Sequence, residues 1–322
     1  MVPLLIGNIF QQFYNMADTI IVGRTISVEA LAAVGATGSI SFLIVGFVQG
    51  VTSGFAVITA QRFGAGSENG VRRSVATSII LGIAVTIVMT AISVLAARPL
   101  LEIMKTPSDI IDDSYNYIIV IFEGIAAAVF FNLFSSILRS LGDSKTPLVF
   151  LIIASIINII LDFVFILTFK MGVAGAGWAT VIAQFISGIL CFVYSLKKFP
   201  ILRLTKHDWK FSWKFAWQHL EVGLPMAFQF SITAIGTMVI QSALNSLGST
   251  AVAAFTAGSK IDQFATQPLA SLGVAVATYT AQNYGARELE RIKKGVTGAA
   301  IIATVCGIVG GFVVIMLSLI HI

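Results

Sequence analysis

The chain has 322 residues, of which 57% are hydrophobic and 11% charged, and it carries a formal net charge of +5. Charged residues make up roughly 25% of an ordinary soluble domain. The composition therefore excludes a typical soluble protein and predicts an integral membrane protein.

Nine apolar stretches follow one another along the chain. Each has the length of about 20 residues that a helix needs to cross the core of a bilayer. Their approximate ranges are 3–23, 34–60, 75–97, 115–138, 147–169, 173–195, 221–247, 251–281 and 296–316. Pro268 predicts a kink in the eighth stretch. We therefore predict an all-α bundle of nine transmembrane helices.

Basic residues gather in alternate loops, after the second, fourth, sixth and eighth stretches. The positive-inside rule places these loops and the N-terminus in the cytoplasm. The positive net charge thus reflects membrane topology, and no nucleic-acid partner is expected. In the loop after the sixth stretch, Trp209, Trp213 and Trp217 lie four residues apart, which predicts an amphipathic helix anchored in the membrane interface.

An internal repeat divides the chain, because residues 30–75 match residues 251–296 without a gap. The run Thr59-Ala60-Gln61, for example, recurs as Thr280-Ala281-Gln282. Six stretches precede the second copy, so both copies cross the membrane in the same direction, as in a parallel repeat about an axis along the membrane normal. The expected parts are a six-helix lobe over 1–196, a cytoplasmic linker over 197–219 and a second lobe over 220–322.

The second lobe holds three stretches where the first holds six, so about three helices are expected to be missing. Residues 317–322 (LSLIHI) resemble the translated start of a transposon adapter used in sequencing libraries, although an ordinary helix end is the alternative. The second copy enters its first helix through an amphipathic stretch that the first copy lacks. Met1 is therefore expected to be an internal methionine.

Two carboxylates lie inside apolar stretches, where an unpaired charge costs several kcal/mol. Gln11, Asn15 and Asp18 occupy one face of the first predicted helix. Asn158 and Asp162 stand four residues apart on one face of the fifth. An amide would provide an interhelical hydrogen bond without the cost of ionisation, which favours a functional role for both aspartates over a purely structural one.

The two aspartates are expected to lie at similar depth. At about 1.5 Å per residue, Asp18 and Asp162 sit roughly 9 and 12 Å below the outer surface, and Thr180 of the sixth stretch reaches a comparable level. Such a group of oxygens suits a small cation such as Na⁺, or a carboxyl pair that shares one proton. The polar residues that could support this site are Gln11, Asn15, Ser155, Gln184 and Glu123. Glu123 could equally face water in an outer vestibule.

Four segments together resemble the MATE (multidrug and toxic compound extrusion) transporters: NMADTIIVG from Asn15, ALAAVG from Ala30, ILRSLGD from Ile137 and NIILD from Asn158. The resemblance implies a twelve-helix, two-lobe, monomeric protein of the bacterial inner membrane. Such a protein exports organic cations and amphipathic drugs in exchange for Na⁺ or H⁺ by alternating access, with no cofactor beyond the coupling ion and no enzymatic activity.

The resemblance also implies roles for individual residues. Asp18, Asn158, Asp162 and Thr180 would form the ion site of the N-terminal lobe. The chain departs from other members in its seventh stretch, where residues 228–234 (FQFSITA) contain no carboxylate.

Two other functions stay open. A lipid-linked precursor flippase of the same superfamily would need Arg or Lys in its cleft, and the apolar stretches offer almost none. A non-transporting scaffold, an inactive fragment or a membrane enzyme is the other class, although no catalytic constellation is visible.

Overall fold

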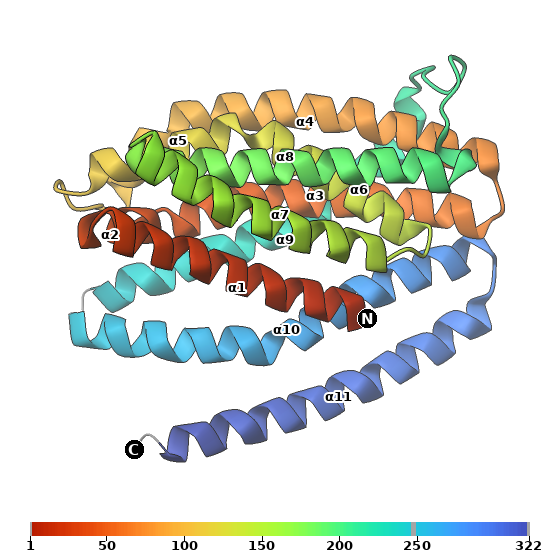
Figure 1. The fold of residues 1–322 in the computed structure, drawn as a ribbon. Coiled ribbons are helices and arrows are strands. Elements are labelled where there is room, and N and C mark those ends of the chain that lie inside the picture. The colour runs from red at the N-terminus through yellow and green to blue at the C-terminus, as the bar shows by residue number, and fades with distance from the viewer. Residues whose placement is uncertain (1, 246–248, 321–322) are drawn as a thin grey trace.

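The computed structural model describes residues 2–245 and 249–320, and the described residues form helices and no strand (Figure 1). The helices are α1 (Val2–Thr25), α2 (Val28–Ala36), α3 (Gly38–Gly64), α4 (Glu68–Ile103), α5 (Ile111–Glu123), α6 (Ile125–Ser140), α7 (Lys145–Phe163), the π-helical turn η1 (Val164–Thr168), α8 (Gly172–Lys198), the 3₁₀ turn η2 (Pro200–Leu202), α9 (Trp213–Asn245), α10 (Ser249–Gly285) and α11 (Leu289–Ile320). The all-α prediction is confirmed, and within the described residues each of the nine apolar stretches falls on one helix or on consecutive helical segments.

Six of these helices are long and apolar enough to cross a membrane, and seven qualify when α5 and α6 count as one bent span. Both α1 and α10 fall outside this set. The amide side chains and Asp18 lower the hydropathy of α1. As predicted, α10 contains Pro268 and changes direction along its length in Figure 1.

The fourth predicted span is broken rather than continuous. Its two helices, α5 and α6, meet at Gly124 with a bend of 48°. A Cβ atom at Gly124 would collide with the side chain of Val181 on α8. The absence of a side chain at the bend therefore lets α8 pack directly against the break.

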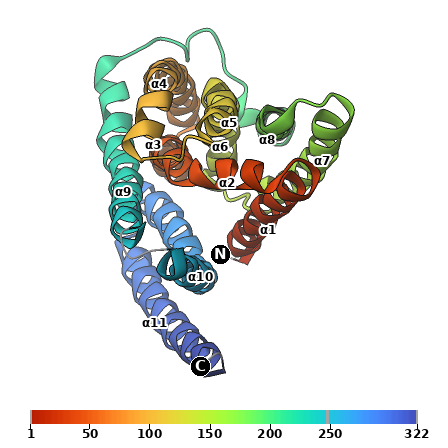
Figure 2. The same ribbon diagram turned by 90° about the vertical axis from the view of Figure 1, so that its left-hand side faces the viewer.

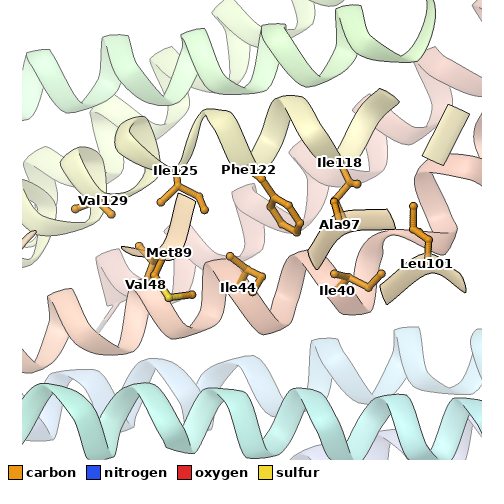
Figure 3. Close-up of a cluster of buried hydrophobic side chains, with 10 residues drawn as sticks. All are labelled: Ile40, Ile44, Val48, Met89, Ala97, Leu101, Ile118, Phe122, Ile125 and Val129. Carbon is orange, nitrogen blue, oxygen red and sulfur yellow. The ribbon is translucent and has the colours of Figure 1, made fainter. Parts of the chain in front are cut away.

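The first six spans share a buried apolar core. Figure 3 shows its largest cluster, in which side chains of α3, α4, α5 and α6 meet. Ile40, Ile44 and Val48 supply the α3 side, and Phe122 and Ile125 flank the bend on the other side. This cluster fixes α3 in the middle of the bundle.

Small residues bring α3 unusually close to α9, the first helix after the linker (Figure 2). A Cβ atom at Gly50 would lie 2.5 Å from the Cα of Ala227, and one at Gly54 would collide with the backbone of Gly223. Only glycine fits at these positions. The Gly46-x-x-x-Gly50-x-x-x-Gly54 pattern thus permits close helix packing.

The two copies of the repeat touch each other reciprocally. A Cβ atom at Gly64 would collide with the backbone of Gln282, and one at Gly285 would collide with the backbone of Gln61. These residues are equivalent pairs in the repeat, Gly64 with Gly285 and Gln61 with Gln282. Contacts in which each copy offers the same two residues are the mark of a two-fold relation between the copies at this junction.

A buried chain of hydrogen bonds crosses the same junction. The Thr59 hydroxyl lies 2.9 Å from that of Ser74, whose oxygen lies 2.9 Å from Nε2 of the fully buried His219. Nδ1 of His219 donates to the Phe215 carbonyl at 2.9 Å. Complete burial disfavours a charged imidazolium, so the ring is neutral with its proton on Nδ1, and Ser74 donates to Nε2. This chain joins α3, α4 and α9.

Replacing His219 by Ala is expected to destabilise the protein by about 2–4 kcal/mol, because it leaves the Ser74 hydroxyl without an acceptor and opens a cavity. Thermal unfolding of the purified protein measures the loss. His207, exposed in the linker, is the matched control, and its replacement by Ala should change stability by less than about 0.5 kcal/mol. Equal stability of the two variants would contradict the structural role of His219.

The linker differs from the predicted interfacial helix. Trp209 lies in a turn, and helical structure begins only at Trp213, where α9 starts. The cause is local, because the Asp208 carboxylate accepts hydrogen bonds of 2.7 Å from both the backbone N–H and the hydroxyl of Thr205, which fixes a turn. The tryptophans are nevertheless all exposed, as expected of an interfacial anchor.

The last helix, α11, packs mainly against α10 and extends away from the other helices in Figure 2. The segment compared with an adapter sequence falls at its end. Residues 321–322 and the side chains of residues 317–320 lie outside the described part of the chain.

Candidate functional site

The two buried aspartates come from neighbouring helices and face each other. Asp18 on α1 is 6% exposed, and Asp162 near the end of α7 is fully buried. The two carboxyl groups are close enough to hydrogen-bond when one of them carries a proton. Two carboxylates this close in a low-dielectric site repel each other, so a bound cation or a shared proton stabilises the pair.

A hydrogen-bonded frame from a third helix borders this carboxyl pair. The Thr180 hydroxyl on α8 accepts from the Tyr14 hydroxyl at 3.1 Å and from Nδ2 of Asn158 at 3.4 Å. Asn158 is fully buried one helical turn before Asp162. The structure thus brings Asp18, Asn158, Asp162 and Thr180 to one place.

Several oxygens of this site have no hydrogen-bond partner among the described residues. They are Oδ1 of Asp18, Oδ1 of Asn158 and both carboxylate oxygens of Asp162. Buried polar atoms are nearly always paired in native proteins. A cluster of free acceptor oxygens suits a hard cation such as Na⁺ or a proton. The described residues contain no group of three or more His, Cys, Asp or Glu of the kind that binds transition metals.

Two tyrosines complete the surroundings of the pair, and sequence reasoning missed both. Tyr14 bonds Thr180, and Tyr117 on α5 lies within electrostatic reach of both carboxyl groups. Tyr14 stands four residues before Asp18, so its place on the polar face of α1 was available as a signal. Tyr117 offered none, since its position depends on how α5 packs against α8.

The polar residues expected to support the site separate into a different feature. Gln11, Ser155 and Gln184 line a neighbouring cavity of about 120 Å³ between α1, α3, α6, α7 and α8. The Asn15 side chain lies outside the described part of the chain. Glu123, at the end of α5, is exposed and is not among the residues that line this cavity, so it does not join it.

Arg139 also lines this cavity, although the sequence placed it among the basic residues of a loop. It belongs to the last turn of α6, which continues through Ser140. Its guanidinium donates to the Ser135 hydroxyl at 2.6 Å and to the Ser136 hydroxyl at 2.7 Å. Arg139 is thus the one base among the residues that line this cavity in the described part of the chain.

Known proteins share both the sequence and the fold of the chain. The MatE family model matches residues 3–164 and 225–321, which is more than half of the chain. Two proteins of Bacillus subtilis, the probable multidrug resistance proteins YoeA and YpnP, are each 30% identical over 91% and 90% of this chain. A more distant relative, 24% identical, is the FAD transporter of Shewanella oneidensis.

Solved structures agree. A MOP superfamily transporter from Pyrococcus furiosus is 28% identical and superimposes with a TM-score of 0.87, covering 95% of this chain and 68% of its own. The chain spans 65% of the length of each Bacillus subtilis relative. With a family model that matches both copies of the repeat, the chain belongs to the MatE family of membrane transporters.

Proposed function

We propose that the protein exports small amphipathic molecules, organic cations among them, in exchange for Na⁺ or H⁺. The observation that carries this proposal is the carboxyl pair, Asp18 with Asp162, buried between membrane helices with unpaired oxygens. Asn158 and Thr180 would contribute the remaining oxygens of the ion site. Two adjacent buried acids cost free energy, and amides could form the same interhelical hydrogen bonds without that cost. A purely structural role therefore does not explain the pair.

Ion binding would drive transport by favouring one of two arrangements of the lobes, 1–196 and 220–322. In this structure the lobes meet where Gly64 and Gly285 touch the opposite copy. Alternating access requires that contact to open and re-form. An ion can shift the balance only by binding one arrangement more tightly, and about 5.5 kcal/mol of difference moves it from 1:99 to 99:1.

The cellular setting is part of the same proposal. The basic loops and the N-terminus would face the cytoplasm of a bacterium, and the protein would act as a monomer in the inner membrane. The exposed tryptophans of the linker segment 197–219 would rest in the interface with lipid headgroups.

A lipid-linked precursor flippase is the weaker alternative. Its diphosphate-bearing substrate calls for several bases in the cleft, because each phosphate is held by Arg or Lys. The cavity beside the carboxyl pair has one, Arg139. A single guanidinium suits one acidic group better than a diphosphate.

Transport across the membrane of reconstituted vesicles tests the proposal. A complete family member that carries these residues is reconstituted into proteoliposomes, and efflux of a fluorescent organic cation is followed after a Na⁺ or a H⁺ gradient is imposed separately. We expect one of the two gradients to drive uphill movement of the dye. Movement that neither gradient accelerates would overturn the exchange mechanism.

A further inference from the structure

The cavity beside the carboxyl pair has a charge of its own that the proposed ion exchange does not use. Arg139 is the only charged residue among those lining it in the described part of the chain. The remaining polar lining consists of amides and hydroxyls, and the amides are Asn8, Gln11, Gln49, Asn132 and Gln184. The cavity is therefore a neutral, hydrogen-bonding chamber with one positive end.

Within the described ranges, no acidic side chain pairs with this positive charge. Arg139 takes part in none of the ion pairs found among the described residues, and the bonds to Ser135 and Ser136 use two of its five N–H groups. An inward-facing guanidinium with only neutral partners is costly, and an acidic ligand would offset that cost.

The nearest acid along the chain already has partners. Asp143 accepts from the Thr146 backbone at 3.0 Å, from the Thr146 hydroxyl at 2.8 Å and from Lys198 at 3.1 Å. Burial alone would raise the pKa of Asp143, but these bonds outweigh burial and hold the pKa below its ordinary value. Asp143 is thus an ionised partner of Lys198 and does not pair with Arg139. The guanidinium of Arg139 can therefore bind an acidic group of a ligand.

The size and walls of the cavity limit what that group can be. A cavity of 150 Å³ holds one benzene molecule, so about 120 Å³ accepts one end of a molecule and not a whole drug. Apolar side chains, among them Leu4, Leu148 and Leu151, surround the amides. The complementary group is a small carboxylate on an apolar or aromatic body, because a planar guanidinium can bind a carboxylate through two parallel hydrogen bonds.

We propose that this cavity binds the acidic end of an amphipathic substrate, with Arg139 as the charge partner of its carboxylate. The inference rests on the proposed transport function, since it names a class of substrate, zwitterionic or anionic amphiphiles, for the same lobe. Tyr14 connects the two features, because it lines the cavity while its hydroxyl bonds Thr180 beside the carboxyl pair.

Binding to the purified chain in lipid nanodiscs tests this with two dyes that differ in one group. Rhodamine B carries a free carboxylate, and its ethyl ester does not. Fluorescence anisotropy should show that Arg139→Gln raises the Kd for rhodamine B by about 10- to 100-fold and the Kd for the ester by less than about twofold. Arg139→Lys keeps the charge but loses the paired hydrogen bonds. Its affinity for rhodamine B should therefore lie between that of the wild-type chain and that of Arg139→Gln.

A competition experiment needs no variant and so does not depend on how Arg139→Gln folds. Benzoate should displace rhodamine B from the wild-type chain, and the neutral isostere benzamide should not. Equal displacement by both, equal weakening of both dyes, or a wild-type chain that binds the ester as tightly as rhodamine B would each overturn the proposal. Dye binding is measured without an ion gradient and gradient-driven efflux is measured separately, so a failure of carboxylate recognition and a failure of ion coupling are distinguishable.

Discussion

Asp162→Asn is expected to abolish ion-driven export while leaving the protein folded and inserted. The amide can neither take up a proton nor balance the charge of Na⁺, so the ion no longer distinguishes between the two arrangements of the lobes. Substrate flux under an imposed gradient should fall by about 5- to 150-fold, the range of a typical coupling free energy, towards the passive leak. Proteoliposome efflux at matched protein density measures the loss.

Glu123→Gln is the matched control for this change. It removes a carboxylate from the neighbouring helix α5, but from an exposed position outside the carboxyl pair. Efflux by this variant should stay within about twofold of the parent, and both variants should unfold at the same temperature as the parent. Undiminished efflux in Asp162→Asn would contradict the assignment of the ion site.

Sequence reasoning found the carboxyl pair because its signal is local. A carboxylate inside an apolar helix is costly enough to stand out alone, and the rise per residue placed Asp18 and Asp162 at similar depth. Thr180 followed from the same measure of depth. Gln11 and Ser155 share a helix face with Asp18 and Asp162, but each stands two helical turns, about 10 Å, away along its helix. They line a separate cavity for that reason.

Features that depend on how helices pack were beyond reach. The bend at Gly124 lies where Val181 of another helix packs against it, and the position of Tyr117 depends on the same contact region between α5 and α8. Arg139 read as a loop residue because helix ends cannot be fixed closely from hydropathy. The predicted linker helix does not include Trp209 for a local reason. The Asp208 side chain stabilises a turn there, and this turn competes with helical structure.

The repeat supplies the second large prediction, an opening of the junction between its two copies. Gly64→Ala and Gly285→Ala each place a Cβ atom against the backbone of the opposite copy, at Gln282 and Gln61, and a backbone cannot move aside as a side chain can. Overpacking of this kind costs about 1–3 kcal/mol. The population with this junction closed should therefore fall by about 5- to 150-fold relative to the open one.

Double electron–electron resonance measures the distance between spin labels at Glu68 and Leu289, and this distance reports the opening of the junction. These exposed residues begin α4 and α11 and are equivalent in the repeat; Cys191 and Cys306 are first replaced by Ser. Gly38→Ala and Gly273→Ala are the controls, because a Cβ atom there meets nothing within 4 Å. Both controls should keep the short distance and gain slightly in helix stability.

The two-fold relation makes this prediction stricter than a test of one contact. Because Gly64 and Gly285 meet equivalent atoms, their replacements should lengthen the distance to the same extent, although one lies in the lobe with the carboxyl pair and the other does not. An effect confined to one of them would show that the junction is asymmetric in energy despite its symmetric geometry. An unchanged distance in both would show that the lobes do not separate there, and alternating access would need a different hinge.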